Sequence, residues 1–314
     1  DPSAHLFNGK IYIYPSHDII EKNPLYDDCG SQYAMRDYRV LSMDYIGGPV
    51  TIHDVALDLD DVLWAKRQFW APDAAEKDGK YYLYFPTKDK EDIFKIGVAV
   101  SNKPEGPFKS KKDPIEGSYS MDPSVFKDDD GKYYMYIGGI WGGQLQRWDE
   151  NNQYTPSGCE TQDNGMPDSP AISPRIALMS DDMVSFAEDP KPVRIIDKDG
   201  KPILTKDHKR RFFEAAWVHK KDGTYYLSYS TGNTHLIVYA TSDNPYGPFV
   251  YQGIMNNPVQ GWTNHHSTLQ VDNKWYFFYH DTQISGKDFL RNVKYTEMFH
   301  EKDGSIKTIN TIIE

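Results

Sequence analysis

Residues 121–137 read MDPSVFKDDDGKYYMYI, and the pattern of this stretch recurs along the chain. Asp122 comes just before a short apolar run, an acidic turn with Gly131 follows, and residues 132–137 then alternate around aromatic side chains. Two alternating runs separated by a glycine-containing turn are typical of a tight β-hairpin. One such hairpin would say little about the fold, but the chain contains five.

The other four copies share the same order of a leading residue, a strand, a turn and an aromatic-rich strand. Their turns are Asn8-Gly9, Asp78-Gly79, Asp222-Gly223 and Asp272-Asn273. Aligned on the turn, the leading residues of the five copies are Asp1, Ala71, Asp122, Glu214 and His265. A leading position that is acidic in three of five copies is the main clue to function.

The segments after the hairpins predict further strands. A third strand is expected at 95–101, and the Pro/Gly turn at 102–108 should start a fourth; residues 236–242 and 243–249 repeat this arrangement. Five units of four antiparallel strands predict an all-β fold, a five-bladed β-propeller. Two β-sandwiches are the alternative, but their strands would not need a shared leading position.

The composition predicts one folded domain over residues 1–314, because no Pro/Ser linker or change in composition divides the chain. The segment 144–174, rich in Asn, Asp, Ser and Pro, is interpreted as a loop insertion in the third blade. Two cysteines, Cys29 and Cys159, are too few for a disulfide framework.

A net charge of −11 argues against nucleic acid or an anionic membrane surface as a partner, whereas a neutral sugar is compatible with it. No run approaches the roughly 18 apolar residues of a membrane span. The printed sequence contains no secretory signal segment. It indicates no oligomeric state.

The chemistry follows from the geometry of a propeller. Its innermost strands line a central channel, so their starting residues converge on one mouth of that channel, and Asp1, Asp122, Glu214 and His265 should therefore share one pocket. Carboxylates held close together cannot all ionise freely, and such a site contains an acid and a base at the same pH. Hydrolysis of a glycosidic bond requires that pair.

Glu214 is the favoured acid, because its apolar neighbours Phe213 and Ala215 should raise its pKa. Asp1 and Asp122 are each followed by Pro-Ser at a polar strand entry and are expected to stay ionised more easily. Two aspartates and one glutamate thus suggest a base, a modulator and an acid.

The motifs that open the five copies resemble those of glycoside hydrolase family 43 over essentially the whole chain. They are Asp-Pro-Ser at 1–3, Trp-Ala-Pro-Asp at 70–73, Asp-Pro-Ser at 122–124, Glu-Ala at 214–215 and His-His-Ser at 265–267. The resemblance implies that Asp1 is the general base, that Asp122 tunes and orients the acid, and that Glu214 is the general acid. It also implies inversion by single displacement, for which the acid and base carboxyl groups should lie roughly 6.5–9.5 Å apart.

The resemblance implies four further site residues. His265 matches a channel position that binds calcium directly or through water, although a metal-free, hydrogen-bonded histidine is the alternative. Trp70 and its counterpart Phe213 are expected to contact the sugar, with core packing as the alternative for Trp70. Arg291 is expected near the substrate, with a surface ion pair as the alternative. No cofactor is expected for the chemistry, and any calcium in the channel would be structural.

The implied activity is that of a β-xylosidase, an α-L-arabinofuranosidase or both, acting on plant polysaccharides or oligosaccharides. An endo-acting xylanase or arabinanase is the alternative, and a pocket closed by loops such as 16–31 or 144–174 would favour exo action. A non-catalytic glycan-binding propeller would lack at least one of the three carboxylates, and a fructan-active propeller would carry different motifs. Polysaccharide hydrolysis predicts a secreted or periplasmic location.

Overall fold

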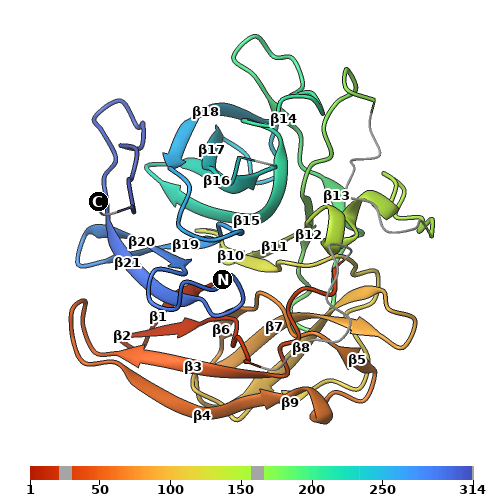
Figure 1. The fold of residues 1–314 in the computed structure, drawn as a ribbon, viewed down its shortest axis with the longest axis vertical. Helices are drawn as coiled ribbons and strands as arrows, with labels where there is room; N and C mark the ends of the chain where they lie inside the picture. The colour runs from red at the N-terminus through yellow and green to blue at the C-terminus, as the bar shows by residue number, and fades with distance from the viewer. Residues whose placement is uncertain (21–29, 157–165, 233, 313–314) are drawn as a thin grey trace.

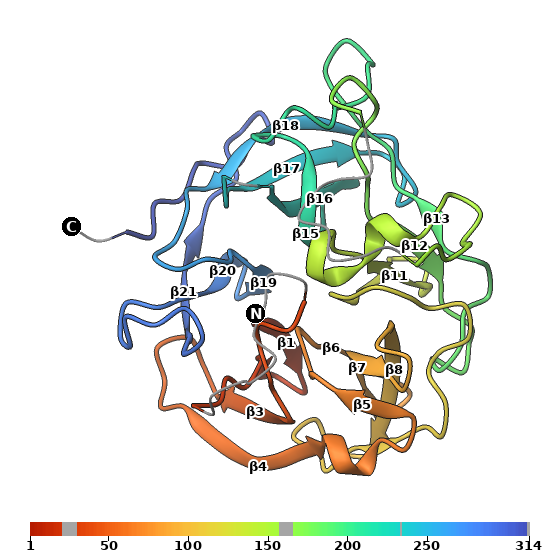
Figure 2. The same ribbon diagram turned by 45° about the vertical axis from the view of Figure 1, so that its right-hand side comes forward.

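The structure, a computed structural model, describes residues 1–20, 30–156, 166–232 and 234–312. In these residues, five β-sheets surround a central axis, with the N-terminus near the middle of the ring (Figures 1 and 2). This arrangement confirms the predicted five-bladed propeller. Cys29 and Cys159 lie outside the described residues.

The five predicted hairpins form the inner strands of the blades. They are β1 (Ser3–Phe7) with β2 (Lys10–Tyr14), β6 (Asp73–Lys77) with β7 (Lys80–Asp89), β10 (Ser124–Lys127) with β11 (Tyr133–Ile137), β15 (Phe212–Lys221) with β16 (Thr224–Thr231), and β19 (His266–Val271) with β20 (Lys274–Asp281). The first strand of each hairpin contacts that of the next blade, and β19 contacts β1. The inner strands therefore close a ring around the channel.

The remaining strands differ from the prediction of four antiparallel strands per blade. They are β3 (Asp37–Met43) and β4 (Thr51–Asp58) in blade 1; β5 (Ala65–Arg67), β8 (Phe94–Ser101) and β9 (Lys109–Ser110) in blade 2; β12 (Arg175–Leu178) and β13 (Lys191–Pro192) in blade 3; β14 (Ile195–Ile196), β17 (Ile237–Ser242) and β18 (Phe249–Asn256) in blade 4; and β21 (Asn292–Met298) in blade 5. Among the described residues, blades 1 and 3 have four strands, blades 2 and 4 have five, and blade 5 has three. The short strand β14 pairs with β18 in parallel.

The turns explain why one repeat pattern gives five hairpins. In four of them, two successive residues have positive φ, as in Asp78 (53°) and Gly79 (73°), or Asp272 (50°) and Asn273 (64°). Two such residues are what a tight hairpin turn needs, and Gly, Asn and Asp accept them most readily. The hairpin of residues 121–137 is less tight than predicted: Lys127 pairs with Tyr133, so 128–132 form a longer connection.

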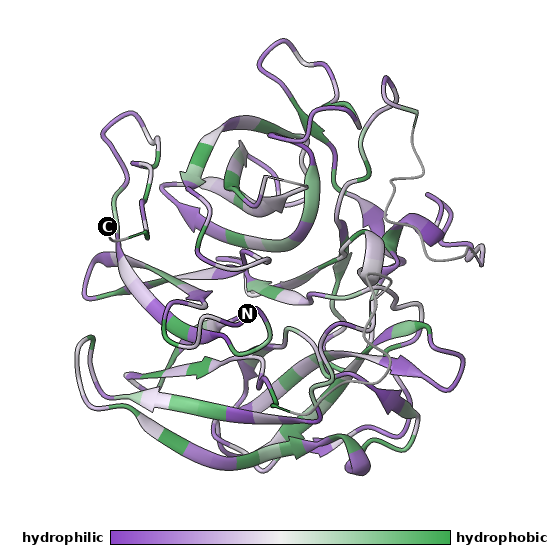
Figure 3. Cartoon of the chain, viewed as in Figure 1, coloured by the Kyte–Doolittle hydropathy of each residue, from purple (hydrophilic) through white to green (hydrophobic). Residues whose placement is uncertain are grey.

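The core lies between the blades rather than within one of them. Each of five clusters of buried apolar side chains joins two neighbouring blades, and one of them joins blade 5 to blade 1 through Phe278, Ala4 and Ile11. Green apolar segments accordingly alternate with purple polar ones along the strands (Figure 3).

The described residues contain three short 3-10 helices, η1 (Leu59–Asp61), η2 (Trp141–Gly143) and η3 (Leu145–Arg147). No helix in these residues is long and apolar enough to cross a membrane.

Asp73 joins three blades at the inner ring, and we expect it to stabilise the fold. Its fully buried carboxylate binds His5 Nε2 of β1 at 2.6 Å and accepts a hydrogen bond from the backbone N–H of Val125 in β10 at 2.5 Å. Asp73→Ala leaves the Val125 N–H unpaired and should lower the free energy of unfolding by about 1–3 kcal/mol in urea denaturation. Asp44→Ala, at an exposed carboxylate, is the control; equal free energies for the two variants would contradict this role.

Candidate active site

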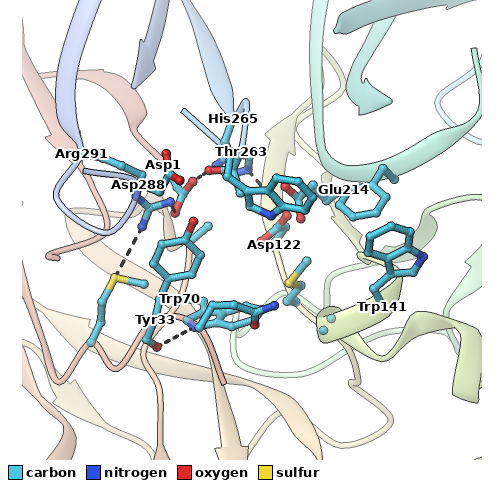
Figure 4. A pocket seen from close by; sticks show the side chains of 18 of the residues that line it. Asp1, Tyr33, Trp70, Asp122, Trp141, Glu214, Thr263, His265, Asp288 and Arg291 are labelled. Atoms are coloured by element: carbon cyan, nitrogen blue, oxygen red, sulfur yellow. Dashed lines mark hydrogen bonds and ion pairs between the residues drawn. The ribbon is translucent and has the colours of Figure 1, made fainter. Parts of the chain in front are cut away.

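The structure brings all the predicted site residues to one cavity of about 330 Å³ at a mouth of the central channel. Residues from all five blades line it, and the predicted ones among them are Asp1, Trp70, Asp122, Phe213, Glu214, His265 and Arg291. Side chains of the three carboxylate residues point toward this common space (Figure 4). The convergence expected from the shared leading position is therefore present.

The backbone around Glu214 is irregular, and a hydrogen bond to the Asp122 side chain stabilises it. Strand β15 has register shifts on both sides of Glu214 in its pairing with β16, and the next residue, Ala215, has φ +62°. Asp122 itself has φ +53°, and its Oδ2 accepts a hydrogen bond from the Ala215 N–H at 3.0 Å. Non-glycine residues with positive φ are uncommon, and bulges re-aim side chains near active sites. Asp122 thus fixes the strand irregularity that directs Glu214 into the cavity.

Burial controls the protonation of both side chains. Burial and the neighbouring Asp122 carboxylate raise the pKa of Glu214 to about 8, although Arg291 opposes this. Burial also raises the pKa of Asp122 to about 7, because it outweighs the hydrogen bond from Ala215. Glu214 therefore keeps its proton at neutral pH, as expected of an acid. The expectation that Asp122 stays ionised easily is wrong, since its side chain lies deep in the site and not at a polar strand entry.

Asp1 is held by two donors on one oxygen. Ser16 Oγ donates to Oδ2 at 2.6 Å, and Arg291 Nη1 donates to the same atom at 2.7 Å. The other oxygen, Oδ1, lies 3.2 Å from His280 Nδ1 and 3.6 Å from His265 Nδ1. Bonds from a hydroxyl and a guanidinium favour the ionised form of a carboxyl group. The arrangement suits a carboxylate that takes up a proton.

Arg291 is buried in the wall of the cavity, and its side chain is only 5% exposed. It forms ion pairs with Asp1 and Asp18, and its guanidinium lies 4.4 Å from the ring centre of Tyr33. Arg291 thus forms ion pairs, but they are buried in the cavity wall and do not lie on the protein surface. Sequence reasoning missed Asp18, which follows the first hairpin and does not belong to the repeated pattern.

Aromatic side chains form the walls of the cavity. Trp70 lines it and also belongs to the core, where its ring lies 4.7 Å from that of Phe94; contact with a sugar stays a prediction. The Trp70 Nε1–H donates to the carbonyl oxygen of Tyr33 at 3.0 Å. Phe213 packs edge to face against Trp141 at 5.1 Å. Such faces suit the apolar face of a sugar ring. Tyr33, Trp141, Trp262 and Phe289 line the cavity too and lacked a repeat signal in the sequence.

His265 was the predicted metal ligand, and the described residues do not form a cage around it. Burial lowers its pKa well below the usual value, so the imidazole is neutral. Its Nε2 lies 3.8 Å from Asp122 Oδ2, and within the described part of the chain Nδ1 has no hydrogen-bond partner. Calcium prefers six to eight oxygen ligands. No group of three or more His, Cys, Asp or Glu among the described residues is arranged to hold a metal ion, so direct chelation by side chains does not fit.

Comparison with known proteins agrees with this geometry. The profile of Glycosyl hydrolases family 43 matches residues 51–306. Xylosidase/arabinosidase 43A of Humicola insolens is 53% identical over 313 residues, which cover 98% of this chain and 95% of that protein. The Xylosidase/arabinosidase of Bacteroides ovatus is 52% identical over 315 residues, covering 98% and 94%.

Solved structures agree as well. CoXyl43, a GH43 β-xylosidase/α-arabinofuranosidase from a compost microbial metagenome, crystallised with xylotriose in a calcium-free form, is 64% identical with a TM-score of 0.97, covering 100% of this chain and 95% of that one. The GH43_1 enzyme from Xanthomonas citri complexed with xylotriose is 50% identical with a TM-score of 0.91, covering 99% and 90%. With this fold, this carboxylate site and these relatives, the chain belongs to glycoside hydrolase family 43 and is an O-glycosyl hydrolase.

Proposed function

We propose that the protein is an exo-acting β-xylosidase and α-L-arabinofuranosidase that removes terminal pentoses from plant oligosaccharides or polysaccharides. The observation that carries this is a single cavity of about 330 Å³ whose walls are aromatic and whose polar groups include three carboxylates. That volume is at the lower end for small-molecule sites and suits a short saccharide end rather than a long chain. The names of the relatives from Humicola insolens and Bacteroides ovatus support the two sugars. The loops expected to close the pocket lie partly outside the described residues, at 21–29 and 157–165.

In the proposed mechanism, Glu214 donates its proton to the oxygen of the leaving group. Asp1 takes a proton from a water molecule through Oδ1, the oxygen that Ser16 and Arg291 do not use. The water attacks the anomeric carbon from the face opposite the leaving group, so the configuration inverts. Asp122 transfers no proton in this scheme; it raises the pKa of Glu214 and holds the backbone at Ala215.

A substrate panel tests the proposed activity. We expect release of pentose from 4-nitrophenyl β-D-xyloside and 4-nitrophenyl α-L-arabinofuranoside, and release of single sugars from the ends of xylo-oligosaccharides. On xylan, the viscosity should fall slowly relative to the release of reducing sugar. A rapid fall in viscosity would show internal cleavage and support the endo-acting alternative, and no turnover of any pentoside would contradict the substrate class.

The pH dependence should report on Glu214. An acid with a raised pKa is active below that pKa, so we expect kcat/KM to fall as the pH rises through about 8. Asp122→Asn removes the negative charge that helps to raise the pKa, while Arg291 still lowers it, so the alkaline limb should move to lower pH. Initial rates across the pH range check this. An alkaline limb that stays in place or moves to higher pH would contradict the role of Asp122.

We also propose that calcium at this site is structural and is bound through water beside His265. The support is an imidazole that lies near two carboxylates without a side-chain cage, and a relative whose crystal form is described as calcium-free. Calcium should then raise the thermal midpoint of the protein but not that of His265→Phe.

A further inference from the structure

We propose that Asp18 is a positioning residue for the general base: it holds Arg291 so that Arg291 orients the Asp1 carboxylate. The inference rests on the proposed function, which assigns the base to Asp1. Asp18 lies after the first hairpin and is not one of the repeated leading positions.

Asp18 holds Arg291 by both its main chain and its side chain. Asp18 Oδ2 accepts hydrogen bonds from the Arg291 backbone N–H at 2.7 Å and from Nε at 2.9 Å, and Oδ1 accepts one from Nη2 at 2.7 Å. A bidentate pair of this kind fixes the plane of the guanidinium. The side chains of Asp18 and Arg291 are 7% and 5% exposed, so water competes little for these bonds.

The bonds between Asp18 and Arg291 determine which nitrogen of Arg291 faces Asp1. With Nε and Nη2 bound to Asp18, Arg291 presents Nη1, which donates to Asp1 Oδ2 at 2.7 Å. Ser16 donates to the same oxygen at 2.6 Å. Both bonds therefore fix Oδ2 and leave Oδ1 for the attacking water. Without the Asp18 carboxylate, the guanidinium could turn its fork toward Asp1 and occupy both oxygens.

Arg291 lies between two cavities. Arg291 lines the active-site cavity and also a second cavity of about 380 Å³ between blades 1 and 5, which Asp18 lines as well. The other walls of this second cavity are largely apolar, including Leu41, Met43 and Val293. Among its lining residues, Asp18 is the carboxylate bound to the guanidinium. Tyr33 and Asp1 also contact the guanidinium, but Asp18 accepts three hydrogen bonds from Arg291, including one from its backbone N–H, and so contributes most to its orientation.

The test compares Asp18→Asn with the wild type on two substrates that differ in their leaving group, 4-nitrophenyl β-D-xyloside and xylobiose. A misplacement of the base should lower kcat on both by the same factor, about 10- to 100-fold, while KM changes little, because small misplacements of catalytic groups have effects of this size. The loss should not depend on the leaving group, since the base acts on water. Asp207→Asn, which removes a carboxylate paired with Arg210 and outside the linings of both cavities, is the matched control and should keep wild-type kcat.

Three results would overturn the proposal. They are an unchanged kcat, a change in KM without a change in kcat, and a decrease in kcat that is much larger for xylobiose than for 4-nitrophenyl β-D-xyloside. The last result would mean that Asp18 affects the general acid Glu214 and not the base. If Asp18→Asn does not fold, as judged by circular dichroism, Asp18→Glu keeps the charge and should show a smaller loss with the same independence from the leaving group. If the proposed function itself is wrong, different results are expected: the wild type would turn over no pentoside, or Asp1→Asn would retain activity.

Discussion

Glu214→Gln is expected to lower kcat for xylobiose about 10²- to 10⁴-fold, the usual contribution of a general acid. The loss should be much smaller for 2,4-dinitrophenyl β-D-xyloside, because that leaving group departs without a proton. The physical basis is the buried position of Glu214 beside Asp122, which keeps the carboxyl group protonated at neutral pH. Steady-state kinetics on the two substrates, with protein of confirmed fold, measure the difference.

The matched control for this prediction is Glu188→Gln. Glu188 is a glutamate between β12 and β13 of blade 3 that binds Lys191 and Tyr246 and is not among the residues that line the active-site cavity. It should retain wild-type kinetics on both substrates. If Glu214→Gln lost the same factor on both substrates, the assignment of Glu214 as the acid would be wrong.

Asp1→Asn is expected to lower kcat about 10²- to 10⁴-fold on every substrate, including the dinitrophenyl xyloside. An amide cannot take the proton of the attacking water, and every leaving group requires that water. The hydrogen bonds from Ser16 and Arg291 can persist to the amide oxygen, so the loss should reflect chemistry more than geometry. Kinetics on the same two substrates separate this variant from Glu214→Gln.

Asp60→Asn serves as the control for Asp1→Asn, because Asp60 is an exposed aspartate paired with Arg36 on the surface. Its kinetics should match those of the wild type. Substantial activity of Asp1→Asn on the dinitrophenyl substrate would show that another group activates the water.

The ring and its pocket could be predicted from the sequence because each blade begins in the same way. A residue at the start of an inner strand has the same place in every blade, so aligning five turns aligned five channel positions. Asp1, Asp122 and Glu214 could be found together for this reason, although they are far apart in the chain. Trp70, Phe213 and Arg291 also lie at the cavity, as the motifs implied.

Features that depend on tertiary contacts could not be predicted in the same way. Asp18 pairs with Arg291 across 273 positions, from a segment that has no equivalent in the other blades. The raised pKa of Asp122 comes from burial that only the assembled ring creates, whereas its local sequence suggested a polar strand entry. The fifth blade is short because, in the described residues after β21, the chain forms isolated bridges instead of a fourth strand.

In the proposed single displacement, Glu214 and Asp1 act on opposite faces of one sugar. Proton NMR of the first-formed xylose from 4-nitrophenyl β-D-xyloside tests this mechanism, because the leaving group is not a sugar and the spectrum identifies the anomer before mutarotation. The mechanism predicts that α-D-xylose appears first and that the β-anomer grows in later. If β-D-xylose appeared first, the configuration would be retained and the assigned roles of Asp1 and Glu214 would be wrong.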